Sequence, residues 1–180
     1  MREPFVVPIA ELLRHRGARR EVTLVGSLPD VGLSTARLVP DEVRADVTLE
    51  AQGSVVTVTG TATGRWTGEC RRCLGPAGGP VTVDLHEVFE PDPVEGETYP
   101  LGRDVLDLRP ALREALALAL PIAPLCDDAC AGPDPEGHPV VPGGAEAPGG
   151  AAEGDGEPSE GDGRPADPRW AALDALRFDR

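Results

Sequence analysis

Residues 43–51, "VRADVTLEA", alternate strictly between apolar and polar side chains. A period of two is typical of a strand in an antiparallel sheet with one face buried and one face in water. The side chains expected on the buried face are Val43, Ala45, Val47, Leu49 and Ala51. This strand is the strongest sequence constraint on the fold, because its neighbours must bury the same face.

Other segments supply those neighbours. Residues 53–64, "GSVVTVTGTATG", are rich in β-branched side chains, and "AQGS" at residues 51–54 predicts a hairpin turn. Residues 20–28 place Val22, Leu24 and Gly26 on one face, and residues 81–89, "VTVDLHEVF", alternate again. Strands and helices do not take turns along the chain, so the sheet is predicted to be antiparallel.

One main helix is expected, over "DVLDLRPALREALALALP". Asp107 can cap it, Pro110 is tolerated in the first turn, and Pro121 ends it. Its apolar stripe is predicted to comprise Leu108, Leu112, Leu116 and Ala119. The predicted fold class is therefore α+β: an antiparallel β-rich domain with one main helix over residues 1–130.

The C-terminal part of the chain has a different composition. Residues 131–167 consist almost entirely of Gly, Pro, Ala, Asp and Glu, and carry nine acidic side chains against Arg164. Such a segment cannot bury enough apolar surface to offset its ordering entropy, so it is predicted to be a disordered acidic insert. Residues 168–180, with "RWAALDALRF", are predicted to form a short amphipathic helix.

The N-terminal residues predict a short helix at Ala10–Arg16, ending at Gly17. The apolar run before it is too short and too interrupted by prolines for a secretory signal. No segment approaches the roughly twenty apolar residues that a membrane span requires. A cytoplasmic protein without membrane contact is expected, and a reducing compartment disfavours structural disulfides.

Four cysteines carry the candidate chemistry. Cys70 and Cys73 lie in "GECRRCLGP", where a predicted strand meets a turn, and Cys126 and Cys130 lie in "PLCDDACAG" after the helix. The turn would let both sulfurs of the first pair face one ion, with Zn–S near ~2.3 Å. One hypothesis is a joint zinc site, and the alternative is four free thiols. Redox catalysis is less favoured, since a thioredoxin-like dithiol begins a helix after a strand.

Arginines surround the first cysteine pair. Arg65, Arg71 and Arg72, with Trp66 nearby, combine basic and aromatic groups as RNA-binding surfaces do. The alternative is an exposed turn with solvated arginines, and the net charge of -14 is unlike that of most proteins that bind RNA unaided. The sequence contains no nucleophile elbow, phosphate loop or dinucleotide fingerprint, so neither an enzyme nor a small-molecule substrate is expected.

Several stretches together resemble the YceD family, which is linked to accumulation of large-subunit ribosomal RNA. They are "ELLRHRGARREV", "GECRRCLGP", "DVLDLRPALREALALALPIAPLC", "CDDACAG" and the terminal "DPRWAALDAL". The resemblance implies a small non-catalytic cytoplasmic protein of α+β build. It also implies a role in the synthesis, processing or stability of 23S ribosomal RNA.

The chain departs from the family pattern after Cys130. Many relatives continue with a second close cysteine pair, whereas here "PDPEGH" places Asp134 and Gly137 at those positions. A four-cysteine cluster local to this loop cannot form. Cys126 and Cys130 must therefore recruit Cys70 and Cys73, or the metal site stays incomplete.

The expected function is that of a ribosome biogenesis factor whose partner is large-subunit ribosomal RNA or a ribosome-assembly protein. If the partner is RNA, the expected contact residues are Arg65, Arg71 and Arg72, and the cysteines organise the turn that presents them. The alternative is a protein-interaction adaptor that binds an enzyme or a ribosomal protein, so that its effects on RNA are indirect.

Overall fold

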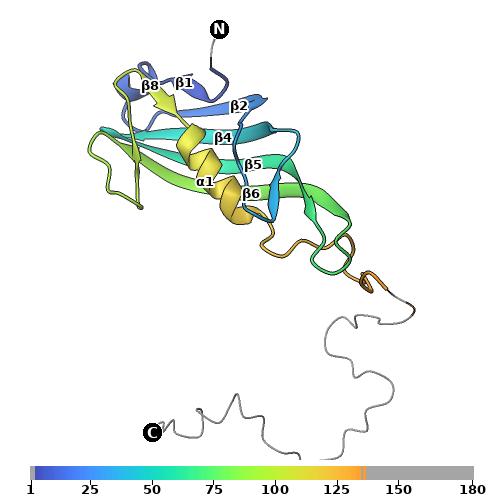
Figure 1. Cartoon of the computed structure of the whole chain (residues 1–180). Coiled ribbons are helices and arrows are strands. Elements are labelled where there is room, and N and C mark those ends of the chain that lie inside the picture. Colours follow the sequence, from blue (N-terminus) through green and yellow to red (C-terminus); the bar gives the residue numbers. More distant parts are fainter. Residues whose placement is uncertain (1–2, 135, 137–180) are drawn as a thin grey trace, which may run out of the picture. The chain divides into compact units, whose positions relative to one another are not determined.

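The structure of the protein, a computed structural model, describes residues 3–134 and 136 (Figure 1). Most of the predicted insert 131–167, with Gly137, and all of the predicted helix 168–180 lie outside the described residues. The elements in chain order are β1 (Val6–Pro8), the 3₁₀ helix η1 (Leu12–Arg14), β2 (Arg19–Ser27), β3 (Ala36–Leu38), β4 (Glu42–Gln52), β5 (Val55–Glu69), β6 (Pro76–Glu90), β7 (Tyr99–Pro100), β8 (Val105–Asp107) and α1 (Arg109–Ala119).

The main sheet has six strands. Its order is β2-β4-β5-β6-β7, and β3 pairs with the far end of β5. All of these pairs are antiparallel, as predicted, except the two-residue parallel contact between β6 and β7. The antiparallel β1–β8 pair forms a separate small sheet. The described residues therefore confirm an α+β architecture built on a mostly antiparallel sheet with one main helix.

Strand β4 confirms the alternation from which its position was predicted. Its five apolar side chains are all buried, and it forms a hairpin with β5 through Gly53 at φ 73. Left-handed backbone of this kind favours glycine, which has no Cβ to clash. Val22, Leu24 and Gly26 share one half-buried face of β2, also as predicted.

Helix α1 lies across one face of the sheet, against β6 (Figure 1). Leu112 and Leu116 are fully buried between them, and Phe89 of β6 is also fully buried. Each such side chain contributes about 1.5–3 kcal/mol by leaving water. The predicted stripe is wrong at Ala119, which is exposed; the chain leaves the helix there and Leu120 is buried instead.

The predicted helix at Ala10–Arg16 is reduced to the single turn η1. The residues before it are extended because β1 pairs with β8, and the Ile9 N–H donates to the carbonyl of Asp104 at 2.9 Å. Gly17, at φ 80, then turns the chain into β2. The tertiary partner β8, distant in sequence, therefore overrides the local helical pattern.

Candidate metal centre and its arginines

The first cysteine pair lies in the turn that joins β5 to β6. These two strands pair continuously from Val56 with Phe89 to Glu69 with Pro76, and their hairpin runs on beyond α1 (Figure 1). In the turn, the Cys70 N–H donates to the carbonyl of Gly75 at 2.8 Å, and the Leu74 N–H donates to the carbonyl of Cys70 at 2.9 Å. A continuous ladder thus positions Cys70 at the strand end, and two further hydrogen bonds fix the turn.

The second pair lies in the irregular segment after α1, which continues beyond the helix to the same turn (Figure 1). The carbonyl of Pro124 accepts a hydrogen bond from the Arg71 N–H at 2.9 Å. The Asp127 carboxylate accepts from the Ala129 N–H at 2.7 Å, and the Asp127 carbonyl accepts from the Cys130 N–H at 3.0 Å. Backbone contacts therefore bring the segment to the turn, and the Asp127 side chain shapes the loop between its cysteines.

The four sulfur atoms form one cluster. The Sγ atoms of Cys70 and Cys130 are 3.8 Å apart, those of Cys73 and Cys126 are 3.7 Å apart, and all four lie within 4.8 Å of one another. A disulfide would require about 2.05 Å, and all four cysteines are free. The structure therefore brings the two cysteine pairs together, as a joint site requires, and the binding of an ion there stays a prediction.

The sulfur spacing fits a tetrahedral metal ion. With metal–sulfur bonds of about 2.3 Å, as for zinc, the edge of a regular tetrahedron is about 3.8 Å. The two short distances match that edge. A set of four thiolates without oxygen ligands suits soft or borderline ions and not magnesium or calcium. The cluster could therefore bind a metal ion through Cys70, Cys73, Cys126 and Cys130.

The protonation of the cluster is uneven. The backbone N–H groups of Cys73, Cys126 and Arg72 donate to the Cys70 sulfur and lower the pKa of its thiol to about 6. Contacts with the sulfurs of Cys130, Cys73 and Cys70 raise the pKa of Cys126 to about 12. A thiolate therefore forms most readily at Cys70, and a bound cation would offset the repulsion among four thiolates at this spacing.

The three candidate RNA-binding arginines have different surroundings. Arg72 is half-buried, and its Nη1 donates to the carbonyls of Asp128 at 2.9 Å and Cys130 at 3.0 Å, joining the two cysteine segments. Arg71 and Arg65 are exposed, and neither side chain has a partner among the described residues. Arg72 thus has a role within the protein that its sequence position did not reveal, and its contact with RNA stays a prediction.

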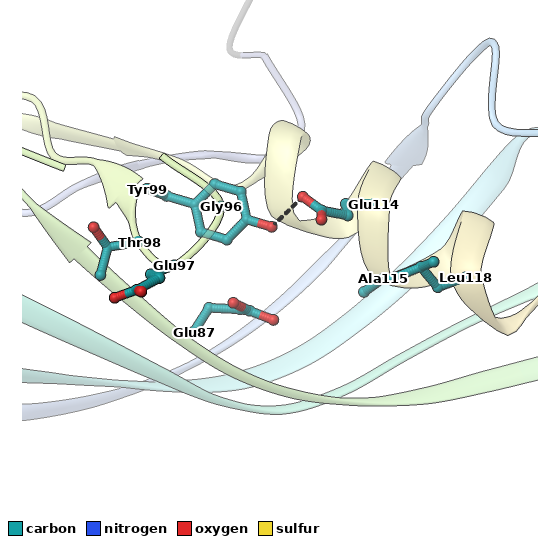
Figure 2. Close-up of a pocket in the computed structure, with 8 residues that line it drawn as sticks. All are labelled: Glu87, Gly96, Glu97, Thr98, Tyr99, Glu114, Ala115 and Leu118. Atoms are coloured by element: carbon teal, nitrogen blue, oxygen red, sulfur yellow. Dashed lines mark hydrogen bonds between the residues drawn. The ribbon is translucent and has the colours of Figure 1, made fainter. Parts of the chain in front are cut away.

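A hollow of about 170 Å³, separate from the sulfur cluster, lies between α1 and the loop before β7 (Figure 2). The Tyr99 hydroxyl points to Glu114 and donates to its carboxylate at 2.7 Å, while the Glu87 carboxylate lies on the sheet side. Burial, followed by repulsion from Glu114, raises the pKa of Glu87. Burial and the Glu114 carboxylate also raise the pKa of Tyr99. The hollow is acidic, and the sequence interpretation did not identify it.

Within the part of the chain that the structure describes, no helix combines the length and apolar character needed to cross a bilayer.

Comparisons with known proteins give one family. The family model "Large ribosomal RNA subunit accumulation protein YceD" matches residues 58–177. The chain is 34% identical to "Uncharacterized protein Rv2926c" of Mycobacterium tuberculosis in an alignment 180 positions long, which covers 94% of this chain and 80% of the relative. It is 31% identical to "Uncharacterized protein ML1660" of Mycobacterium leprae over 140 aligned residues, which cover 72% of this chain and 64% of the relative. No solved structure matches the chain.

Proposed function

The chain belongs to the YceD family of large ribosomal RNA subunit accumulation proteins, and on this premise we propose that it is a non-catalytic ribosome biogenesis factor. It supports the synthesis, processing or stability of large-subunit ribosomal RNA by contacting that RNA. The observation that carries the proposal is the position of Arg71, an exposed and unpartnered arginine among the described residues, between two cysteines of the sulfur cluster. Arg65, on the adjoining strand, is also exposed.

Zinc is the proposed ion of the cluster. It would supply no reaction chemistry here; it would hold the hairpin turn against the segment after α1, with four thiolate ligands and no site left open. The support is the sulfur spacing and the all-cysteine ligand set. The full-length protein, purified in reducing buffer, should contain one equivalent of zinc by mass spectrometry of the native protein. A protein purified free of zinc that also takes up none on titration would contradict the proposal.

A salt titration tests the RNA contact. Labelled transcripts of large-subunit ribosomal RNA should bind the full-length protein, with an affinity that falls steeply as salt increases, because each neutralised phosphate releases counterions. Arg71→Ala and Arg65→Ala should each weaken binding several-fold and reduce the salt slope by about 0.7–0.9. Arg103→Ala removes an equal charge from an exposed position before β8 and should leave binding unchanged. The absence of binding at low salt would contradict direct contact.

A protein adaptor is the second candidate. Leu118 on α1 and Ile122 after it are 80% and 81% exposed, which is unusual for large apolar side chains at neighbouring positions. The chain is also strongly acidic, so a basic ribosomal protein would be the complementary partner. In this case Leu118→Asp and Ile122→Asp would remove the partner from affinity purifications, and Arg71→Ala would not.

A further inference from the structure

A groove runs beside β3 to the sulfur cluster. Two adjoining hollows of about 360 and 370 Å³ share Ser34, Thr35 and Glu69. The first also reaches Arg37 on β3, and the second reaches Arg71 in the cysteine turn. We call these two hollows together the β3 groove; an exposed arginine lies at each end of it.

The groove depends on close packing of the loop before β3 against β5. The loop crosses β5 at Gly68, where a Cβ atom would collide with the carbonyl oxygen of Thr35. The Thr35 hydroxyl donates to the carbonyl of Pro121 at 3.3 Å, which attaches the loop to the segment after α1. The walls of the groove therefore come from the loop before β3 and from the same segment that carries the second cysteine pair.

The charges favour an anionic occupant. Arg37 pairs with Thr67 across the ladder, so its side chain lies on the same face as Arg65, two residues along β5. Like charges at such a diagonal position repel, while Glu69 occupies the other diagonal position on the same face. Neither arginine forms an ion pair among the described residues. The repulsion is offset when an anion binds both guanidinium groups.

Among the residues that the structure describes, one acidic side chain lines the groove. Glu69 lies between the arginines at its two ends, so the net charge of the lining is positive although the chain is acidic overall. Leu33 and Ile122, 41% and 81% exposed, add an apolar side chain near each end. A phosphodiester chain with apolar base faces matches this alternation of cationic and apolar groups.

We infer that the β3 groove binds the backbone of single-stranded RNA, with Arg37 and Arg71 each contacting a phosphate and Arg65 lying beside the Arg37 end. The inference rests on the proposed function and deepens it, because it assigns a strand of RNA to a defined path and adds Arg37 to the contact residues. A surface built on β3 was not foreseen, since three residues between loops carry no periodic signal. Glu69 opposes binding along this path.

The test is a salt titration of fluorescence anisotropy with the full-length protein in reducing buffer and a labelled oligouridine of about twelve nucleotides, within the usual span of a single-strand site. Arg37→Ala should weaken binding by about tenfold at 0.1 M salt and reduce the salt slope by about 0.7, the value for one phosphate on a single strand. Arg37→Lys should retain the slope. Glu69→Gln should strengthen binding, by about two- to threefold from the loss of one nearby repulsive charge.

One control variant and three comparisons separate this inference from the proposed function. Arg103→Ala, an equal loss of charge at an exposed position between β7 and β8, should bind as the unmodified protein does. If Arg71→Ala weakens binding but Arg37→Ala and Glu69→Gln do not change it, the groove path is overturned while direct RNA contact stands. If oligouridine does not bind at low salt although ribosomal transcripts do, the single-strand assignment is overturned. If polyglutamate competes as well as RNA does, the groove is instead a site for acidic protein segments.

Discussion

The two halves of the β5–β6 hairpin are stabilised by different contacts. In the half covered by α1, the fully buried side chains include Val56, Val58 and Phe89, against Leu112 and Leu116 of the helix. At the other end, here called the cysteine end (residues 66–79 and 122–130), only Cys70 and Ala77 are buried among residues 66–79. Apolar burial therefore dominates the contacts of the first half, whereas the cysteine end has the sulfur cluster and hydrogen bonds between its loops.

The largest effect on stability should follow from truncating a buried side chain in the apolar half. Leu112→Ala removes a fully buried side chain and should lower the free energy of unfolding by about 2–5 kcal/mol, measured by urea denaturation. The zinc content of the folded protein should stay the same, since no cysteine changes. Leu118→Ala, at an 80% exposed position on the same helix, is the control and should change stability by less than about 0.5 kcal/mol. Equal losses in the two variants would contradict the packing described here.

Removing one sulfur should affect the cysteine end alone. Cys126 is exposed, so Cys126→Ser deletes one of the proposed metal ligands with little loss of packing. Zinc should be lost, and hydrogen exchange at the amides of Cys70, Arg71 and Leu74 should accelerate at least about tenfold, because local opening there no longer breaks metal bonds. Treatment with a chelator should reproduce this result in the unmodified protein. Equal acceleration in α1 would show that the two halves unfold as one unit.

Arg72 offers a smaller perturbation of the same end. Arg72→Ala deletes two hydrogen bonds, to the carbonyls of Asp128 and Cys130. Groups that orient metal ligands typically affect metal affinity about 10- to 100-fold. We expect about tenfold weaker zinc binding in a competition titration with a chromogenic chelator, without loss of the fold. The control Arg71→Ala should retain full affinity, because only the backbone of Arg71 contacts the second segment.

The smallest effect concerns pH in the α1 half. Glu87 has a raised pKa in the folded protein, from burial and then from Glu114, so the folded state holds its proton to higher pH than the unfolded state does. Stability from this group therefore falls as pH rises from about 4.5, the unfolded value, through the folded pKa. Glu87→Gln should raise Tm by about 1–2 °C at pH 7, because solvent screens a partly exposed charge, and the gain should disappear below pH ~4. A gain that persists at low pH would implicate packing instead.

Sequence reasoning succeeded where a local pattern coincided with burial. The alternation of Val43 to Ala51 fixed both the strand and its buried face, and the apolar spacing of Leu108, Leu112 and Leu116 did the same for α1. Strands β1, β3, β7 and β8 were missed, since each is two or three residues long and is defined by its pairing with another segment. Such pairing leaves no periodic trace in the sequence.

The candidate site was predictable in its ligands and not in its surroundings. Cysteine spacing, together with the cysteine pattern that the resemblance implies near Asp134, was enough to propose that the two pairs combine, and the four sulfurs do lie together. The bonds of Arg72 and the proximity of Arg37 depend on how loops cross β5 at Gly68, which no spacing rule encodes.

The pairing of Cys73 with Cys126 has a consequence for the order of assembly. An ion bound to all four sulfurs would close the stretch from residue 73 to residue 126 into a ring that contains β6 and α1 entire. While the chain is being synthesised, that ring cannot shut until Cys130 has left the ribosome. Binding of an ion by all four cysteines would therefore occur only after the sheet and its helix have both been synthesised. A chain truncated before Cys130 would not bind the ion in this way.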